Sequence, residues 1–245
     1  MKRLKNKYSF IHSMKRFLLF SLLLNVLLIA GVSYAVNRIG GWKYALNRLR
    51  HSESGLYSHR KSLFERMPDR PGAVVFLGDS QMEQGEWQEI FSPIPNVLNR
   101  GISGDNVNGV WERLNEVMRH KPQKVFLLVG VNDLFRDKAP AEIETRYREI
   151  VQRIRREQPD GQLVLMSVLP VNKEIRSLSA DNTDVQALNG RIAQIAKEFA
   201  LPYVDLYGQL TDATGNLSVQ FTSDGIHLNG LGYMVMKKQL EPFLR

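Results

Sequence analysis

Short apolar runs recur along this chain from residue 73 onward, and amphipathic stretches separate them. A short run that is apolar at nearly every position is typical of a strand buried on both faces of a parallel sheet. A stretch with apolar residues three and four positions apart predicts a helix with one buried face. The predicted strands are 73–77, 96–99, 125–129, 163–168 and 203–206. The clearest predicted helices are 107–119, 141–156, 185–199 and 232–243.

The order of these elements predicts the fold class. Strands that alternate with helices form right-handed crossovers, which give an α/β domain whose parallel sheet is covered by helices on both faces. Ligands of such sheets bind beyond the carboxyl ends of the strands. We therefore expect the chemistry of this protein in the loops at 78–82, 100–106, 130–134 and 169–182, and in the segment before the last helix.

The N-terminus has a different pattern. Residues 17–37 carry no charge, and an apolar run of about 20 residues forms a helix of roughly 30 Å, which is long enough to cross a bilayer. Basic residues without any acid precede this run, which by the positive-inside rule places the N-terminus in the cytoplasm. We predict a basic cytoplasmic leader at 1–16, a transmembrane signal anchor at 17–36, a helical stalk at 37–70 and a catalytic domain at 71–245. The catalytic domain would then lie outside the cytoplasm, in a periplasmic or extracellular position.

Two other interpretations of the apolar segment stay open. Ser33 and Ala35 have the spacing of a signal-peptide cleavage site, so cleavage after Ala35 would give a secreted domain. The run is longer than the roughly 7 to 15 residues of a signal-peptide core, which favours the uncleaved anchor. A buried core helix is the third interpretation, and it is disfavoured because the flanking basic residues would be hard to place.

The charge of the chain is unevenly distributed. Residues 1–70 hold 14 Lys and Arg against 3 acidic residues, whereas the remaining 175 residues hold 19 against 22. The net charge of +8 therefore belongs to the leader and stalk, and we expect no nucleic-acid partner because the domain has no basic run. The chain has no cysteine, which excludes disulfides, thiolate metal sites and a cysteine nucleophile.

Polar residues suited to chemistry follow the first three predicted strands. Ser80 lies at a strand-to-helix turn, where its hydroxyl would project at the carboxyl edge of the sheet. Gly104 lies in a loop where the backbone can approach a ligand closely, and Asn132 is placed to donate an amide hydrogen bond into the cleft. Each segment also has a simpler interpretation as a turn or helix cap, with Asp105 or Asn106 capping the helix after the second strand.

Asp224 and His227 lie in the loop before the last predicted helix. A carboxylate three residues before a histidine would accept a hydrogen bond from one ring nitrogen while the other ring nitrogen faces a serine hydroxyl. The same spacing is common in surface turns. The other histidines compete poorly, because His120 ends a predicted helix, where a protonated ring suits the helix dipole, and the rest precede the domain. These are His12, His51 and His59.

The four segments together are far more specific than any one of them. They read GDS at 78–80, GISGD at 101–105, GVND at 130–133 and DGIH at 224–227. This series resembles the four conserved blocks of the SGNH, or GDSL-like, hydrolases, and the resemblance covers roughly residues 70–243. Within that family, the stretches at 87–93, 98–106 and 110–114 are similar to the catalytic subunits of platelet-activating-factor acetylhydrolase and their bacterial relatives.

The resemblance implies a fold and a set of catalytic roles. The fold is a flavodoxin-like three-layer α/β/α sandwich with a five-stranded parallel sheet. Ser80 would be the nucleophile, His227 the general base and Asp224 its orienting partner. The backbone N–H groups of Ser80 and Gly104 and the side-chain amide of Asn132 would form the oxyanion hole.

The resemblance also implies an activity. We expect a serine esterase that hydrolyses short-chain, most simply acetyl, esters of an envelope glycan or a phospholipid, with no cofactor and no metal. An O-acyltransferase that uses the same triad is one alternative, and a catalytically inactive envelope-binding or scaffold module is another. The sequence Gln81-Met82-Glu83 departs from the apolar residue and threonine that often follow GDS in the family, which leaves the pocket shape open. The sequence contains no signal for the oligomeric state.

Overall fold

The computed structural model describes residues 2–50 and 55–244. The chain divides into two compact units, Met1–Gly55 and Leu56–Arg245. Residues 51–54 of the predicted stalk, His51 among them, lie outside the described residues, as do the two terminal residues.

The first unit consists of two helices. α1 spans Lys2–Arg38 and α2 spans Gly41–Arg50. Gly40 and Gly41, with φ of +114° and +84°, adopt the left-handed backbone that favours glycine, and α1 ends just before them. The segment Met14–Arg38 is long and apolar enough to cross a membrane, and its apolar side chains are exposed. Its length and composition fit the membrane segment predicted at 17–36.

The second unit is built on a five-stranded parallel sheet with strand order β2-β1-β3-β4-β5. This is the order of a flavodoxin-like sheet, so the predicted fold class is confirmed. The direction of the order reverses between β1 and β3, where ligands of this fold bind at the carboxyl edge. The strands are β1 (Val74–Gly78), β2 (Val97–Gly101), β3 (Lys124–Leu128), β4 (Gln162–Met166) and β5 (Tyr203–Val204).

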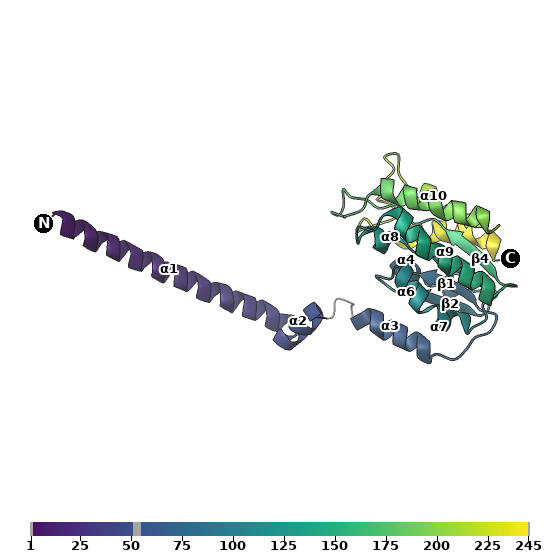
Figure 1. The fold of residues 1–245 in the computed structure, drawn as a ribbon, viewed down its shortest axis with the longest axis horizontal. Helices are drawn as coiled ribbons and strands as arrows, with labels where there is room; N and C mark the ends of the chain where they lie inside the picture. The colour runs from purple at the N-terminus through teal and green to yellow at the C-terminus, as the bar shows by residue number, and fades with distance from the viewer. Residues whose placement is uncertain (1, 51–54, 245) are drawn as a thin grey trace. The chain divides into compact units, whose positions relative to one another are not determined.

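Helices cover both faces of the sheet and enclose two apolar cores (Figure 1). Successive residues of β1 enter alternate cores, Val75 and Leu77 on one face and Val74 and Phe76 on the other, as the two-residue period of a strand requires. The first face is covered by α6 (Val107–Glu112), α7 (Leu114–Met118), α8 (Val131–Leu134), α9 (Pro140–Glu157) and α10 (Asn182–Glu198). The second is covered by α4 (Ser80–Glu83), α5 (Trp87–Ile90), α11 (Tyr207–Leu210), α12 (Gly230–Leu240) and the 3₁₀ helix Glu241–Phe243.

The helix α3 (Gly55–Arg66) packs on the second unit, although the sequence analysis assigned these residues to the stalk. Its Phe64 is 4% exposed, and the guanidinium of Arg100 lies over the ring at 4.5 Å from the centroid. Arg119 donates hydrogen bonds to the carbonyls of Phe64 and Met67 at 2.8 and 2.7 Å. The second compact unit therefore includes α3 and begins at Leu56. Helical periodicity predicted the helix, but it contained no information on what the helix packs against.

One predicted helix differs in detail. The stretch 107–119 is interrupted at Arg113, which separates α6 from α7. The Arg113 side chain turns inward and donates to the carbonyls of Gly78 and Arg100 at 3.0 and 2.8 Å. The other predicted helices appear as α9, α10 and α12 with the 3₁₀ turn after it.

Candidate active site

The turn after β1 presents Ser80 at the carboxyl edge of the sheet. Asp79 is the N-cap of α4, because its Oδ1 accepts a hydrogen bond from the Gln81 backbone N–H at 3.0 Å. Ser80 is therefore the first residue of α4 and is 6% exposed. The strand-to-helix turn predicted from the sequence is present.

The loop before α12 folds around the carboxylate of Asp224. Its Oδ1 accepts hydrogen bonds from the backbone N–H groups of Ile226 and His227 at 3.0 and 2.8 Å. These two bonds close a tight turn, in which Gly225 has a left-handed φ of +80°. Because both bonds use Oδ1, Oδ2 of Asp224 can accept from another partner. That partner is Nδ1 of the His227 ring, 2.6 Å away. Because Asp224 and His227 are three residues apart, the Asp224 carboxylate binds both the backbone of the turn and the His227 ring.

The other ring nitrogen of His227 meets the serine. Nε2 lies 3.0 Å from Oγ of Ser80. Because an ionised carboxylate only accepts hydrogen bonds, Nδ1 carries the ring proton and Nε2 accepts from the Ser80 hydroxyl. The His227 and Asp224 side chains are 29% and 39% exposed, so the site opens to solvent.

The environment of Asp224 keeps this carboxylate charged. Partial burial opposes ionisation, but hydrogen bonds from the backbone and ring of His227 and from the Ile226 N–H outweigh it. Together they lower the pKa of Asp224 to about 2. The group therefore remains an acceptor for the imidazole at all physiological pH values.

Gly104 lies in the loop after β2, and Asn132 lies in α8, which follows β3. Gly104 has φ of +81°, in the region that favours glycine. The side-chain amide of Asn132 donates one hydrogen bond to the carbonyl of Asp105 at 2.9 Å. A carboxamide has two N–H donors, and the second has no partner within 55–244. Arg136 joins the Gly104 loop to α8 by donating to the Gly104 carbonyl at 3.0 Å and to the Asn132 carbonyl at 3.4 Å.

A buried ion pair that the sequence analysis missed supports the Gly104 loop. Asp105 accepts from Nε of Arg113 at 2.7 Å, and both side chains are almost fully buried. Asp105 is therefore not the helix cap. Asn106 has that role, because its side chain accepts from the Gly109 N–H at 2.9 Å. In the sequence, Arg113 is indistinguishable from an arginine on the solvated face of a helix.

Asp133 connects the third block to the second. It is fully buried, and its carboxylate accepts from the Val107 N–H at 2.9 Å and from Nζ of Lys138 at 3.0 Å. The acidic residues that end the GISGD and GVND segments thus hold the segments that carry Gly104 and Asn132. No role was predicted for Asp133 from the sequence.

His120 does not have the environment that the sequence suggested. Its ring is fully buried, and its Nδ1 accepts a hydrogen bond from the Arg70 backbone N–H at 3.0 Å. Burial lowers the pKa of His120, so a neutral ring replaces the predicted charged one. Nε2 lies 3.1 Å from Glu116 Oε1, to which the neutral ring donates. This histidine therefore has a structural role: it binds the segment before β1 through the Arg70 backbone.

The buried carboxyl of Asp79 leads to a prediction on stability. Its Oδ2 has no hydrogen-bond partner among the described residues. Burial raises the pKa of Asp79 to about 7, and the charges of Asp105 and Asp133 contribute to the rise. The hydrogen bond from the Gln81 N–H acts in the opposite direction and lowers the pKa. The unfolded chain releases this proton near pH 4, whereas the folded chain holds it to about pH 7. The free energy of unfolding should therefore fall as pH rises through this interval.

Replacing Asp79 with asparagine keeps an acceptor for the Gln81 N–H and removes the charge. Asp79→Asn should exceed the parent in stability by roughly 2 to 4 kcal/mol at about pH 8, and the difference should nearly vanish at about pH 4. Denaturant titrations at the two pH values measure it. A stability difference that does not change with pH would show that the parent carboxyl titrates normally.

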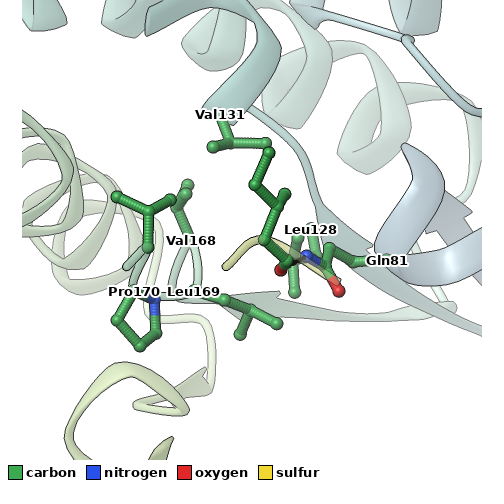
Figure 2. Close-up of a pocket in the computed structure, with 8 residues that line it drawn as sticks. Gln81, Leu128, Val131, Val168, Leu169 and Pro170 are labelled. Carbon is green, nitrogen blue, oxygen red and sulfur yellow. Dashed lines mark hydrogen bonds between the residues drawn. The ribbon is translucent and has the colours of Figure 1, made fainter. Parts of the chain in front are cut away.

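A narrow, mainly apolar crevice lies beside the site, and the space between its lining side chains is too small for a water molecule (Figure 2). Its lining includes the neighbours of three site residues, namely Gln81, Val131 and Ile226. The Gln81 side chain is buried, and its Nε2 donates to the Ile226 carbonyl at 2.6 Å. Gln81 therefore joins the turn that carries Ser80 to the loop that carries His227. Other lining residues, labelled in Figure 2, are Leu128, Val168, Leu169 and Pro170.

No group of three or more His, Cys, Asp or Glu side chains close enough to hold a metal ion occurs in the described part of the chain.

The same segments match a known family. The model of the GDSL-like lipase/acylhydrolase family matches residues 76–235, which is more than half of the chain. The chain belongs to the GDSL-like lipase/acylhydrolase family. It is therefore a hydrolase, and the resemblance recognised from its four sequence blocks is confirmed.

Individual relatives of this GDSL-like hydrolase agree with the assignment. Platelet-activating factor acetylhydrolase IB subunit alpha2 of Homo sapiens is 31% identical over 183 residues, which cover 72% of this chain and 77% of the relative. A solved structure from Streptococcus pneumoniae, described as a platelet activating factor, has a TM-score of 0.73 at 27% identity and covers 84% of this chain and 100% of its own. An acetylxylan esterase from Geobacillus stearothermophilus shares the fold, with a TM-score of 0.59 at 18% identity over 72% of this chain and 95% of its own.

Proposed function

We propose that this GDSL-like hydrolase is a serine esterase that removes short acyl groups, acetyl above all, through an acyl-enzyme. Ser80 is the nucleophile, His227 the general base and Asp224 its orienting partner. The observation that carries the proposal is the continuous hydrogen-bonded series from Asp224 Oδ2 through the imidazole to Ser80 Oγ, with distances of 2.6 and 3.0 Å. A serine hydroxyl is a poor nucleophile until a neighbouring base takes its proton, and this series supplies the base.

In the first half of the reaction, Ser80 Oγ forms a bond to the ester carbonyl carbon while its proton moves to Nε2 of His227. The carbonyl oxygen becomes an oxyanion, which we assign to the N–H groups of Ser80, Gly104 and the Asn132 amide. When the intermediate collapses, the ester C–O bond breaks and the imidazolium returns the proton to the departing alcohol oxygen. The acyl group is then bound to Ser80.

In the second half, water replaces the alcohol. His227 takes a proton from this water as its oxygen attacks the acyl carbon, and the second oxyanion occupies the same site. Collapse breaks the bond to Ser80 Oγ, which recovers its proton from the ring. The products are a carboxylic acid and the free enzyme, so one ester and one water are consumed in each cycle.

Two observations support a short acyl group. The crevice beside the site is too narrow for a water molecule and is lined mainly by Val, Leu, Ile and Pro. The human relative is named an acetylhydrolase. A crevice this narrow excludes a long acyl chain, whereas a methyl group would need only a small opening of its lining.

The membrane position is also part of the proposal. The exposed apolar segment Met14–Arg38 supports a single transmembrane anchor within 17–36, which follows the basic leader at 1–16. We propose that the leader lies in the cytoplasm and the hydrolase domain outside it, where esters of envelope glycans and phospholipids occur. Cleavage after Ala35 would export the same domain in soluble form.

A panel of acyl esters tests the substrate class. The purified full-length chain in detergent should hydrolyse an acetyl ester at least roughly tenfold faster, in kcat/KM, than a long-chain ester of the same alcohol, with a butyryl ester between them. A long-chain preference would contradict the short-acyl proposal. Adding a sugar acceptor and analysing the products distinguishes hydrolysis from acyl transfer, since transfer would leave an acylated sugar instead of free acid.

A further inference from the structure

A single guanidinium from α3 connects two parts of the candidate active site. Nε of Arg60 donates to the carbonyl of Gly101 at 2.6 Å, and its Nη2 reaches Oδ1 of Asn99 at 3.4 Å. The same group pairs with Oε1 of Glu83 at 3.6 Å. Gly101 ends β2, which leads into the loop of Gly104, whereas Glu83 is the last residue of α4, which begins with Ser80. Arg60 thus bridges the nucleophile helix and the candidate oxyanion loop.

Glu83 reaches the loop from the other side of this ion pair. Its Oε2 accepts a hydrogen bond from the Ser103 backbone N–H, one residue before Gly104. The loop also lies directly on α4, because a Cβ added to Gly101 would meet the Glu83 backbone nitrogen at 2.0 Å. A larger residue at Gly101 would push the two segments apart. The Glu83 carboxylate therefore joins the Ser103 backbone N–H to α4, the helix that begins with Ser80.

A second α3 side chain contacts the loop just beyond Gly104. The hydroxyl of Tyr57 donates to Oδ1 of Asp105 at 3.3 Å. Contacts from α3 and Glu83 therefore lie on both sides of Gly104, while Gly104 itself has no side chain to hold it. The left-handed φ of +81° at this residue lets the chain pass between the two sets of contacts.

We propose that Arg60 and Glu83 are positioning residues for the oxyanion hole and that they set the distance between the Gly104 N–H and the Ser80 turn. This inference rests on the proposed function. An oxyanion donor must lie within a few tenths of an ångström of its working position, and an error of about 1 Å costs on the order of a hundredfold in rate. Arg60 lies outside residues 76–235, the part that the family model matches. The helix α3, which precedes the matched part, thus contributes to the proposed active site.

Point variants of the full-length chain test this inference. Arg60→Gln should lower kcat for an acetyl ester by roughly ten- to a hundredfold with little change in KM, because the oxyanion exists only in the transition state. Glu83→Gln keeps an acceptor for the Ser103 N–H and loses the charge, so its kcat should fall less. The double variant should be no slower than Arg60→Gln, since the two residues act as one unit.

Matched controls lie on the same helix. The Arg66 side chain is exposed and donates to the Ser62 carbonyl of its own helix at 2.9 Å, and Glu65 is exposed. Arg66→Gln and Glu65→Gln should keep the parent kcat. Thermal melting of every variant identifies loss of fold. If Arg60→Gln unfolds, Arg60→Lys and Glu83→Gln carry the test, and Arg60→Lys should recover part of the rate because it restores the charge.

The outcomes separate this inference from the proposed function. Unchanged kcat in folded Arg60→Gln and Glu83→Gln, with an inactive Ser80→Ala, would overturn the positioning role alone. A rise in KM with constant kcat would overturn it too, because it would indicate substrate binding. Activity that survives in Ser80→Ala would instead overturn the proposed function. A selective loss of kcat, with coupling between Arg60 and Glu83, supports the inference.

Discussion

Ser80→Ala should lower the turnover of an acetyl ester by roughly 10³- to 10⁶-fold, to the level that binding and the oxyanion donors alone can sustain. The hydroxyl removed is the one that lies 3.0 Å from His227 Nε2, and no other described side chain offers a hydroxyl to that nitrogen. Stability should stay within about 1 kcal/mol of the parent, because the change removes one partly exposed hydrogen bond. Steady-state kinetics and thermal melting measure the two effects.

The control for this prediction is another serine close to the site. Ser103 uses its backbone N–H to bind Glu83, and its side chain is exposed, so Ser103→Ala should retain the parent turnover within about twofold. A fluorophosphonate probe should label the parent chain and leave Ser80→Ala unlabelled. Labelling or turnover equal to the parent in Ser80→Ala would remove Ser80 from the nucleophile role.

Asn132→Ala should lower kcat by roughly a hundred- to a thousandfold, or about 3 to 4 kcal/mol of barrier, with a much smaller change in KM. One N–H of this amide is held by the Asp105 carbonyl at 2.9 Å, which orients the second N–H toward one fixed direction. A donor that is already oriented costs no reorganisation when the oxyanion forms, so its loss appears in the transition state rather than in substrate binding. Steady-state kinetics with a saturable acetyl ester give both parameters.

Asn108 provides the matched control for the asparagine. It is exposed on α6, where its side chain accepts from Nε of Arg146 at 3.0 Å. Asn108→Ala should keep kcat within about twofold of the parent. An Asn132→Ala chain that is folded and loses less than about tenfold in kcat would indicate that this amide only holds the loop of Asp105.

These predictions concern three sets of residues in the proposed active site. In the proposed mechanism, His227 takes the proton of Ser80 while Asp224 orients the ring. The N–H groups of Gly104 and Asn132 would receive the developing charge, and the charged groups behind them would hold those N–H groups in place. The last set includes Arg60 and Glu83, together with the buried pair of Asp105 and Arg113 and the carboxylate of Asp133. Their removal should therefore have smaller effects than removal of the groups that touch the ester.

Much of the fold and the candidate site could be predicted from the sequence because the signals are local. The run at 73–77 predicted β1 because a strand buried on both faces must be apolar at nearly every position. The turns at Ser80 and His227 depend on carboxylates that bind backbone N–H groups two or three residues away, so residue spacing alone specifies them. The apolar segment Met14–Arg38 is equally local, since length and hydropathy define it.

Tertiary structure alone decided the properties that depend on distant residues. Arg113 and His120 look like surface residues of an amphipathic pattern, yet both are buried because β2 and the segment before β1 supply their partners. Asp79 has an ordinary capping position, and its pKa is raised by its burial in the domain and by the charges of Asp105 and Asp133, which come from distant segments. α3 is a predicted helix, but its contact with the Gly104 loop joins residues more than 40 positions apart. Periodicity reports which side of an element is buried, whereas charge and hydrogen bonding depend on what the fold brings to that side.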